Sequence, residues 1–224
     1  MAYYPLIIVL VLAIADWIAA DRQLKALEYF AKPATMLALL WWIWQNVGLG
    51  GAMSWFTIGA VFCLAGDVFL MLPVDMFIFG LLSFLLGHVF YIVGLSQTAP
   101  YINVLGGILI VLLAIYIWWL YPKLTKGLGT MGKGSLKIPI LVYAVVISLM
   151  VYSAVMSWTR PGWTAGAALA VSLGALLFYA SDSMLAWDRF YKPLSHARVR
   201  VMTTYHLGQI GIILGAMLSI MGKG

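Results

Sequence analysis

The chain has little charge and almost no cysteine. Only 9% of its 224 residues are charged and 64% are hydrophobic, whereas roughly 25% of the residues in soluble domains are charged. Mean hydropathy is +1.03. A soluble domain of this size needs more polar surface, so the composition excludes a soluble globular enzyme and a disordered protein. Cys63 is the single cysteine, which excludes an intrachain disulfide and therefore a secreted disulfide scaffold.

A basic face for nucleic acid is also missing. The net charge is +6, but the lysines and arginines lie mostly in loops between apolar runs, where membrane topology requires them. No soluble segment combines a basic stripe with interleaved aromatic residues. We therefore expect no nucleic-acid partner.

What the sequence has in abundance is long apolar runs. Spanning helices need ~20 apolar residues, and barrel strands would alternate with period two over ~10 residues. The runs are long and continuously apolar, so helices are the better interpretation. The sequence predicts an all-α polytopic membrane protein with eight transmembrane helices, forming a single integral membrane domain over residues 1–224. The runs cover residues 4–20, 33–47, 53–72, 76–95, 101–121, 138–157, 164–187 and 200–221.

The distribution of basic residues predicts the orientation. Of the thirteen lysines and arginines, all but Arg160 and Lys223 lie in the loops that follow odd-numbered runs. The positive-inside rule then places these loops in the cytoplasm and both termini outside. The N-terminus has no basic segment before its first apolar run, which indicates a retained helix. Together with the compact chain, this favours a bacterial inner membrane.

The two halves of the chain show an internal similarity. Ala65-Gly66-Asp67 resembles Ala180-Ser181-Asp182, and each motif is followed by a second aspartate, an aromatic residue and a helix that carries histidine and tyrosine. The motifs lie four spans apart, so their helices run in the same direction. This pattern predicts a parallel four-plus-four repeat with halves 1–122 and 138–224, joined by a Lys/Gly-rich linker at 123–137.

A few ionisable residues interrupt the apolar runs. Each charged residue at mid-helix costs roughly 2.5–3.5 kcal/mol on insertion scales, so such residues are usually functional. Asp67 and Asp182 lie at similar depth in the predicted cytoplasmic half. Other polar residues on several runs share that leaflet or lie slightly deeper, which predicts a site there. They are Asp16, Lys32, His88, Tyr91, Tyr205, His206 and Gln209.

Two intramembrane carboxyls suggest acid–base chemistry. A carboxyl buried away from water favours its neutral form and can donate a proton, while a better solvated carboxyl stays ionised. Two such carboxyls could cleave acetals, epoxides or vinyl ethers, because cleavage of these bonds needs a proton and a water molecule. Nothing in the residues themselves selects among these bonds.

The chain resembles the YhhN-like lysoplasmalogenase family from about residue 30 to 220. The motifs that carry the resemblance appear in the family's order: Lys32-Pro33, Gly66-Asp67, Phe79-Gly80, Phe84, Gly87-His88, Tyr91, Ser181-Asp182-Ser183, Tyr205 and Gln209. The resemblance implies an eight-helix membrane hydrolase without a cofactor. Its substrate would be a lysoplasmalogen, a lysophospholipid with a vinyl-ether chain. Its products would be a fatty aldehyde and glycerophospho-ethanolamine or -choline.

The carboxyl chemistry and the family resemblance together predict how the site works. Asp182 acts as the acid and Asp67 as the base, although the sequence does not separate their roles. Lys32 pairs with the lipid phosphate. We expect the remaining residues to bind or orient substrate and water: Ser181, His88, Tyr91, Tyr205 and Gln209.

Two other functions remain open at this stage. A zinc-dependent lipid amidase of the ceramidase type would need His88, His206 and an aspartate as ligands, although a helical His-x3-His pair is absent. A transporter or proton-coupled channel would use the two aspartates as a relay, and the repeat favours it. The glycine-rich helix faces serve packing within or between chains equally well, so the oligomeric state is not predicted.

Overall fold

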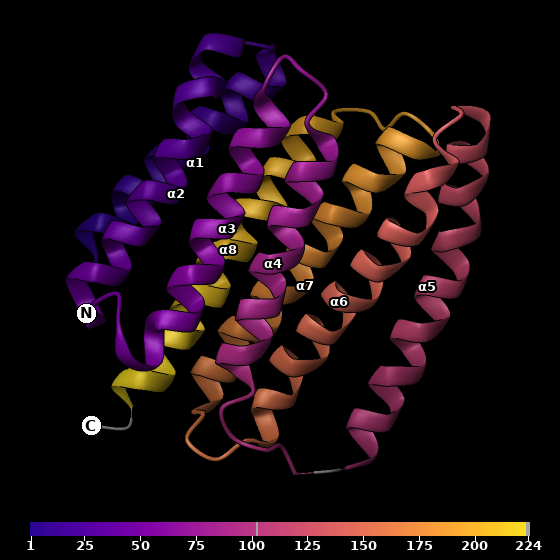
Figure 1. The fold of residues 1–224 in the computed structure, drawn as a ribbon. Coiled ribbons are helices and arrows are strands. Elements are labelled where there is room, and N and C mark those ends of the chain that lie inside the picture. Colours follow the sequence, from indigo (N-terminus) through magenta and orange to yellow (C-terminus); the bar gives the residue numbers. More distant parts are fainter. Residues whose placement is uncertain (102, 223–224) are drawn as a thin grey trace.

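The computed structural model describes residues 1–101 and 103–222, and this part of the chain is helical with no strand. Ile102 in the predicted fifth run and Lys223 lie outside the described residues. The described residues form eight α-helices: α1 (Tyr4–Arg22), α2 (Lys25–Val47), α3 (Ser54–Met71), α4 (Phe77–Leu95), α5 (Val104–Thr130), α6 (Lys137–Val155), α7 (Ala165–Phe190) and α8 (Ala197–Met221) (Figure 1). Short 3-10 helices lie between some of them: η1 (Gly51–Met53), η2 (Gly134–Leu136) and η3 (Met156–Thr159).

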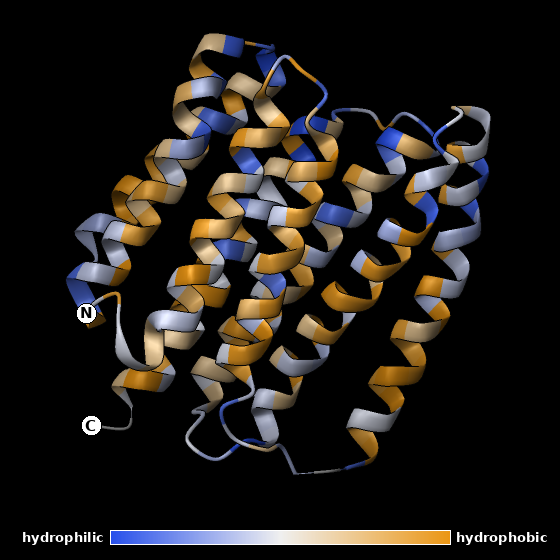
Figure 2. Cartoon of the chain, viewed as in Figure 1, coloured by the Kyte–Doolittle hydropathy of each residue, from blue (hydrophilic) through white to orange (hydrophobic). Residues whose placement is uncertain are grey.

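The helices form one bundle in which sequence neighbours run antiparallel. The turns after α1, α3, α5 and α7 lie at one end of the bundle, and both termini lie toward the other (Figure 1). Hydrophilic residues concentrate at the end that carries these turns (Figure 2). The loops that carry most of the lysines and arginines therefore lie at the same end of the bundle. We call this end the basic end.

The helical membrane class is confirmed. Seven helices in the described part of the chain are long and apolar enough to span a bilayer, and α2 is the exception. The reason lies at its two ends, because Lys25, Glu28 and Lys32 occupy its first turns and Gln45 and Asn46 its last. The eighth span therefore stays a prediction.

The structure corrects two predicted boundaries. Helix α2 begins at Lys25 and continues through Pro33, so Lys32 lies two turns inside a helix instead of at its start. Helix α5 continues through Pro122 to Thr130, so most of the predicted linker is helical. Leu124 and Leu128 explain the extension, because both are buried in a cluster with Phe77 and Phe190. This burial outweighs the backbone hydrogen bond that a proline removes.

Glycines bring α3 against α4 and α7 against α8. A side-chain carbon added at Gly59 would lie 3.1 Å from the carbonyl oxygen of Gly87, and one added at Gly174 would lie 2.7 Å from that of Gly208. Gly59 stands eight residues before Asp67, and Gly174 stands eight residues before Asp182. These matched close contacts support the predicted repeat, which stays a prediction.

Candidate active site

Asp182 on α7 is the centre of one polar cluster. The phenol of Tyr143 on α6 donates a hydrogen bond to Oδ2 of Asp182. Nε2 of His88 on α4 lies 3.0 Å from the Tyr143 oxygen and 3.4 Å from the same carboxyl oxygen. The His88 side chain is fully buried, whereas 14% of the Asp182 side chain is exposed. Three helices thus hold a carboxyl that remains reachable.

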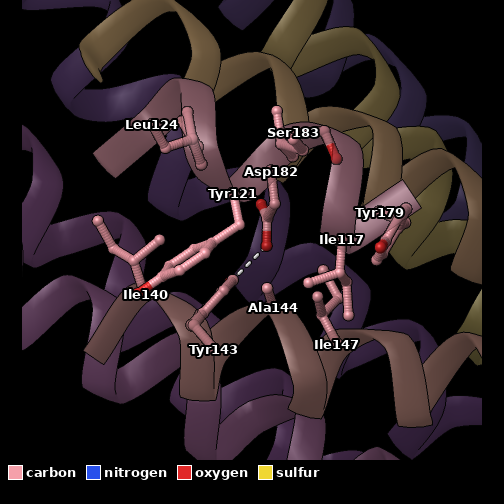
Figure 3. A pocket seen from close by; sticks show the side chains of 12 residues that line it. Ile117, Tyr121, Leu124, Ile140, Tyr143, Ala144, Ile147, Tyr179, Asp182 and Ser183 are labelled. Atoms are coloured by element: carbon pink, nitrogen blue, oxygen red, sulfur yellow. Dashed lines mark hydrogen bonds between the residues drawn. The ribbon is translucent and has the colours of Figure 1, made fainter. Parts of the chain in front are cut away.

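Asp182 and Tyr143 line two small apolar hollows. The first, the α5 hollow, has a volume of about 50 Å³ and lies between α5, α6 and α7 (Figure 3). The second, the α4 hollow, also measures about 50 Å³ and is lined by residues of α3, α4, α6 and α7. Ile140 and Ala186 border both hollows as well. The carboxyl therefore lies where two apolar spaces meet, and each space exceeds the ~10–15 Å³ that one water needs.

A larger polar hollow opens at the basic end. Its volume is about 510 Å³, and its walls come from the first turns of α2 and α8 and the last turns of α3 and α7. It carries both signs of charge, and Arg198 donates a hydrogen bond to Glu28. Leu70 and Leu185 line both this hollow and the α4 hollow, so the two adjoin. The charged lining residues are Lys25, Glu28, Lys32, Asp188 and Arg198.

Asp67 on α3 forms a second cluster with different character. Its Oδ1 lies 3.2 Å from Nζ of Lys32 on α2, and its Oδ2 accepts a hydrogen bond of 2.6 Å from the phenol of Tyr205 on α8. The Asp67 side chain is 1% exposed and that of Lys32 is 5% exposed. Lys32 also lines the polar hollow. Asp67 therefore holds a buried ammonium group that borders the polar hollow.

Aromatic rings connect the two clusters. The ring of Phe178 lies 4.7 Å from that of His88 and 5.2 Å from that of Tyr205, measured between centroids. Phe84 packs against both Phe178 and Tyr205. The structure thus brings His88 to Asp182, and Lys32 and Tyr205 to Asp67. The two carboxyls belong to separate clusters with aromatic side chains packed against both.

The partners of the two carboxyls follow one pattern. Each aspartate contacts one residue on the preceding long helix, Lys32 on α2 or Tyr143 on α6. Each also contacts one residue on the last helix of the other half, Tyr205 on α8 or His88 on α4. Two repeated halves that face each other would each supply a partner to the aspartate of the other half. The pattern therefore supports the predicted repeat.

Three other predicted site residues connect helices. The Tyr91 phenol donates a hydrogen bond of 2.6 Å to the side-chain oxygen of Gln209, which joins α4 to α8. The Ser181 hydroxyl donates to the backbone carbonyl of Val201 at 3.0 Å, which joins α7 to α8. All three side chains are buried. Their roles in substrate binding stay predictions.

Sequence reasoning missed Tyr143. Its only signal is a tyrosine within the aliphatic run 138–150, and aromatic residues are common in membrane helices. Trp17 was also missed, and its indole donates a hydrogen bond of 3.1 Å to Nδ1 of His206. His88 and His206, which the zinc hypothesis requires together, have these different partners. No group of three histidine, cysteine or acidic residues placed to hold a metal occurs within residues 1–101 and 103–222.

Asp75 connects the loops at the basic end. It lies between α3 and α4 and accepts hydrogen bonds from Lys133 at 3.2 Å and from Arg189 at 2.9 Å. The hydrogen bond from Lys133 and the nearby guanidinium of Arg189 lower the pKa of Asp75 from its ordinary value. Asp188, by contrast, accepts a backbone hydrogen bond from Leu194. These two aspartates therefore hold loops at the basic end.

Comparison with known proteins gives one consistent result. The sequence profile of the YhhN family matches residues 27–216. A mouse protein named lysoplasmalogenase TMEM86B is 30% identical over 95% of this chain and 85% of its own length. Its human counterpart is 31% identical, over 92% and 82%. A Mycobacterium bovis protein named lysoplasmalogenase is 30% identical, over 75% and 62%. No solved structure gives a significant match.

Proposed function

The chain belongs to the YhhN family, and we propose that it is a lysoplasmalogenase, a hydrolase that cleaves the vinyl-ether bond of a lysoplasmalogen. The names of its relatives support this activity. The observation that carries the chemistry is the position of Asp182, a carboxyl held by Tyr143 and His88 where two apolar hollows meet. A lipid chain fits apolar walls, and the carboxyl supplies the proton that vinyl-ether cleavage needs.

The polar hollow is the proposed place for the lipid headgroup. Lys25, Lys32 and Arg198 line it, and ammonium and guanidinium groups bind phosphate oxygens through charge-assisted hydrogen bonds. The hollow adjoins the α4 hollow at Leu70 and Leu185. A lysophospholipid with its phosphate in the polar hollow would therefore direct its ether bond toward Asp182.

The proposed reaction starts with protonated Asp182. Its Oδ1 proton passes to the second carbon of the alkenyl chain, and the electrons of the double bond form the new C–H bond. The first carbon and the ether oxygen then share the positive charge of an oxocarbenium ion. Tyr143 and His88 stabilise the resulting carboxylate at Oδ2. General acid catalysis of this kind contributes typically ~10²–10⁴-fold.

The same carboxylate completes the reaction. It takes one proton from a water molecule while the water oxygen bonds to the first carbon, which gives a hemiacetal and restores protonated Asp182. The bond from the hemiacetal carbon to the glycerol oxygen then breaks as the hemiacetal hydroxyl forms the carbonyl of the aldehyde, and the proton of that hydroxyl passes to the glycerol oxygen, which leaves as the free alcohol. The products are a fatty aldehyde and glycerophospho-ethanolamine or -choline. In this scheme Asp67, the base predicted from sequence, instead positions Lys32 through their ion pair.

Release of aldehyde from a lysoplasmalogen by the purified protein in detergent tests the proposal. We expect aldehyde release with and without a chelator, because in the proposed reaction the Asp182 carboxyl acts as both acid and base. Asp182→Asn should abolish release while the protein stays monodisperse. Asp21→Asn is the matched control, because Asp21 is exposed and its carboxylate pairs with the exposed His196. Near-normal release by Asp182→Asn would overturn the acid role. If the unaltered protein releases no aldehyde, lipid amide cleavage is the next activity to measure.

We also propose that the basic end faces the cytoplasm of a bacterial cell, with both termini outside. The clustering of Arg22, Lys25, Lys133, Arg189 and Arg198 in or beside the turns at that end supports this orientation. The polar hollow would then open at the cytoplasmic leaflet. Labelling of a cysteine introduced at Gly132 should require permeabilised cells. Labelling of intact cells would reverse the orientation.

A further inference from the structure

We propose that the α5 hollow holds the alkenyl chain of the substrate, that the chain leaves it for the bilayer between α5 and α6, and that Ala144 limits the chain that fits. This inference rests on the proposed lysoplasmalogenase function. It adds a binding site for the chain, a route out of the protein and a residue that determines specificity.

The order of the three hollows matches the order of groups in the lipid. The polar hollow meets the α4 hollow at Leu70 and Leu185. The α4 hollow meets the α5 hollow at Asp182 and Tyr143. A molecule that follows this path passes from charged groups to a carboxyl and then to an apolar slot. A lysoplasmalogen presents phosphate, ether bond and hydrocarbon chain in the same sequence.

The α5 hollow has the lining that a hydrocarbon chain requires. Ile117, Leu120 and Leu124 contribute its α5 wall, and Ile140 and Ile147 contribute much of its α6 wall (Figure 3). A chain that moves from the bilayer into such a space keeps apolar surroundings. The polar hollow has apolar lining residues too, but Lys25, Glu28 and Arg198 also line it, and such charged groups suit a headgroup rather than a hydrocarbon chain. The chain therefore belongs on the α5 side of Asp182.

Helix α5 offers a lateral route because many of its side chains are exposed at the edge of the bundle. Its buried residues lie near its start and in its second half, at Gly106, Leu120, Leu124 and Leu128. The side chains between these regions include Ile108, Val111, Leu112 and Ile115, which are all more than half exposed. Figure 1 shows α5 at the edge of the bundle. A chain that leaves the hollow along α5 therefore meets lipid, which is as apolar as the side chains it leaves.

Ala144 is the small residue on the α6 wall of this hollow. It follows Tyr143, the partner of Asp182, and precedes Ile147 by three positions, so it lies on the face that α6 turns toward α5 and α7. Val145, the next residue, is 42% exposed and points away from the hollow. A phenylalanine at position 144 would occupy the slot, whereas one at position 145 would extend into lipid.

Turnover of a long-chain and a short-chain lysoplasmalogen by the full-length protein tests the role of Ala144. We expect Ala144→Phe to lower the ratio of kcat/KM values, long over short, by about 10-fold or more, the scale on which hydrophobic pockets discriminate methylene groups. Val145→Phe should leave the ratio unchanged. An unchanged ratio in a folded Ala144→Phe protein would overturn the inference. Failure of the unaltered protein to release any aldehyde would instead count against the proposed function.

A second experiment needs no variant. An alkyl-ether lysophospholipid has a saturated chain, so it cannot undergo the proposed protonation and remains bound. With a photoreactive diazirine on a chain carbon close to the ether bond, it should label peptides that contain residues 117–124 of α5 or 140–147 of α6. Labelling confined to α2 or α8 would place the chain elsewhere and overturn the inference, whatever the turnover assay shows.

Discussion

Tyr143 on α6 donates its phenolic hydrogen to Oδ2 of Asp182 on α7, the same oxygen that His88 approaches at 3.4 Å. One carboxyl oxygen is thus held by the protein, and the other remains available for proton exchange. The buried Asp67, in contrast, has one oxygen beside Lys32 and the other beside Tyr205. This difference is the reason for assigning proton transfer to Asp182.

Tyr143→Phe should lower kcat by about 10- to 100-fold, because hydrogen bonds to charged groups contribute ~1.5–3 kcal/mol and Tyr143 stabilises the carboxylate formed after proton transfer. The ring keeps its shape, so the variant should still fold, with a lower Tm because a buried hydrogen bond is lost. Aldehyde release measured against Tyr152→Phe, on the same helix, provides the comparison. Equal kcat in the two variants would mean that Tyr143 has no part in the reaction.

Removal of Asp67 should destabilise the protein more than removal of Asp67 and Lys32 together. Asp67→Asn leaves a buried ammonium group without its carboxylate, and breaking a buried ion pair costs about 3–5 kcal/mol. The double variant Lys32→Met with Asp67→Leu removes both charges and should recover much of the lost Tm in detergent. We expect its KM to stay high, because Lys32 lines the proposed phosphate site. A double variant less stable than Asp67→Asn would contradict this account.

Asp75 predicts a pH-dependent contribution to stability. Its folded-state pKa is lowered by the hydrogen bond from Lys133 and the charge of Arg189, so its ion pairs stabilise the fold above the unfolded-state pKa of about 3.9. That contribution is lost as pH falls through the folded-state pKa. The Tm of the unaltered protein should exceed that of Asp75→Asn near neutral pH, and the difference should shrink below about pH 4. The side chain is 59% exposed, so screening by solvent keeps the difference small. A difference that does not vary with pH would refute the assignment.

Gly174 and Gly166 on α7 should respond oppositely to alanine. A side-chain carbon at Gly174 would lie 2.7 Å from the backbone carbonyl oxygen of Gly208, whereas one at Gly166 meets nothing within 4 Å. Overpacking costs typically ~1–3 kcal/mol, so Gly174→Ala should lower Tm. Gly166→Ala should keep or raise Tm, because alanine is favoured over glycine in helices. Equal Tm values would show that α7 and α8 are not held this closely.

Particular residues show how far sequence reasoning reached. Asp67, Asp182, His88 and Lys32 were identified because ionisable residues are rare in apolar runs, and the structure places each beside another polar residue. Tyr143 was missed because a tyrosine in a membrane helix costs little and carries no such signal. The end of α5 was wrong because local residues, Pro122 and the glycines after it, indicate a break. Burial of Leu124 and Leu128 against residues far along the chain decides otherwise.

The sequence by itself determined the membrane class, the helical architecture and the family, because these follow from composition, from the length of apolar runs and from the order of short motifs. Only the tertiary structure decided which polar residue meets which. A pairing such as Tyr143 with Asp182 depends on the rotation and spacing of α6 and α7, and packing between segments that are distant in the sequence sets both. The same packing leaves Asp182 beside open apolar space and encloses Asp67 with Lys32. Two similar motifs therefore have two different environments.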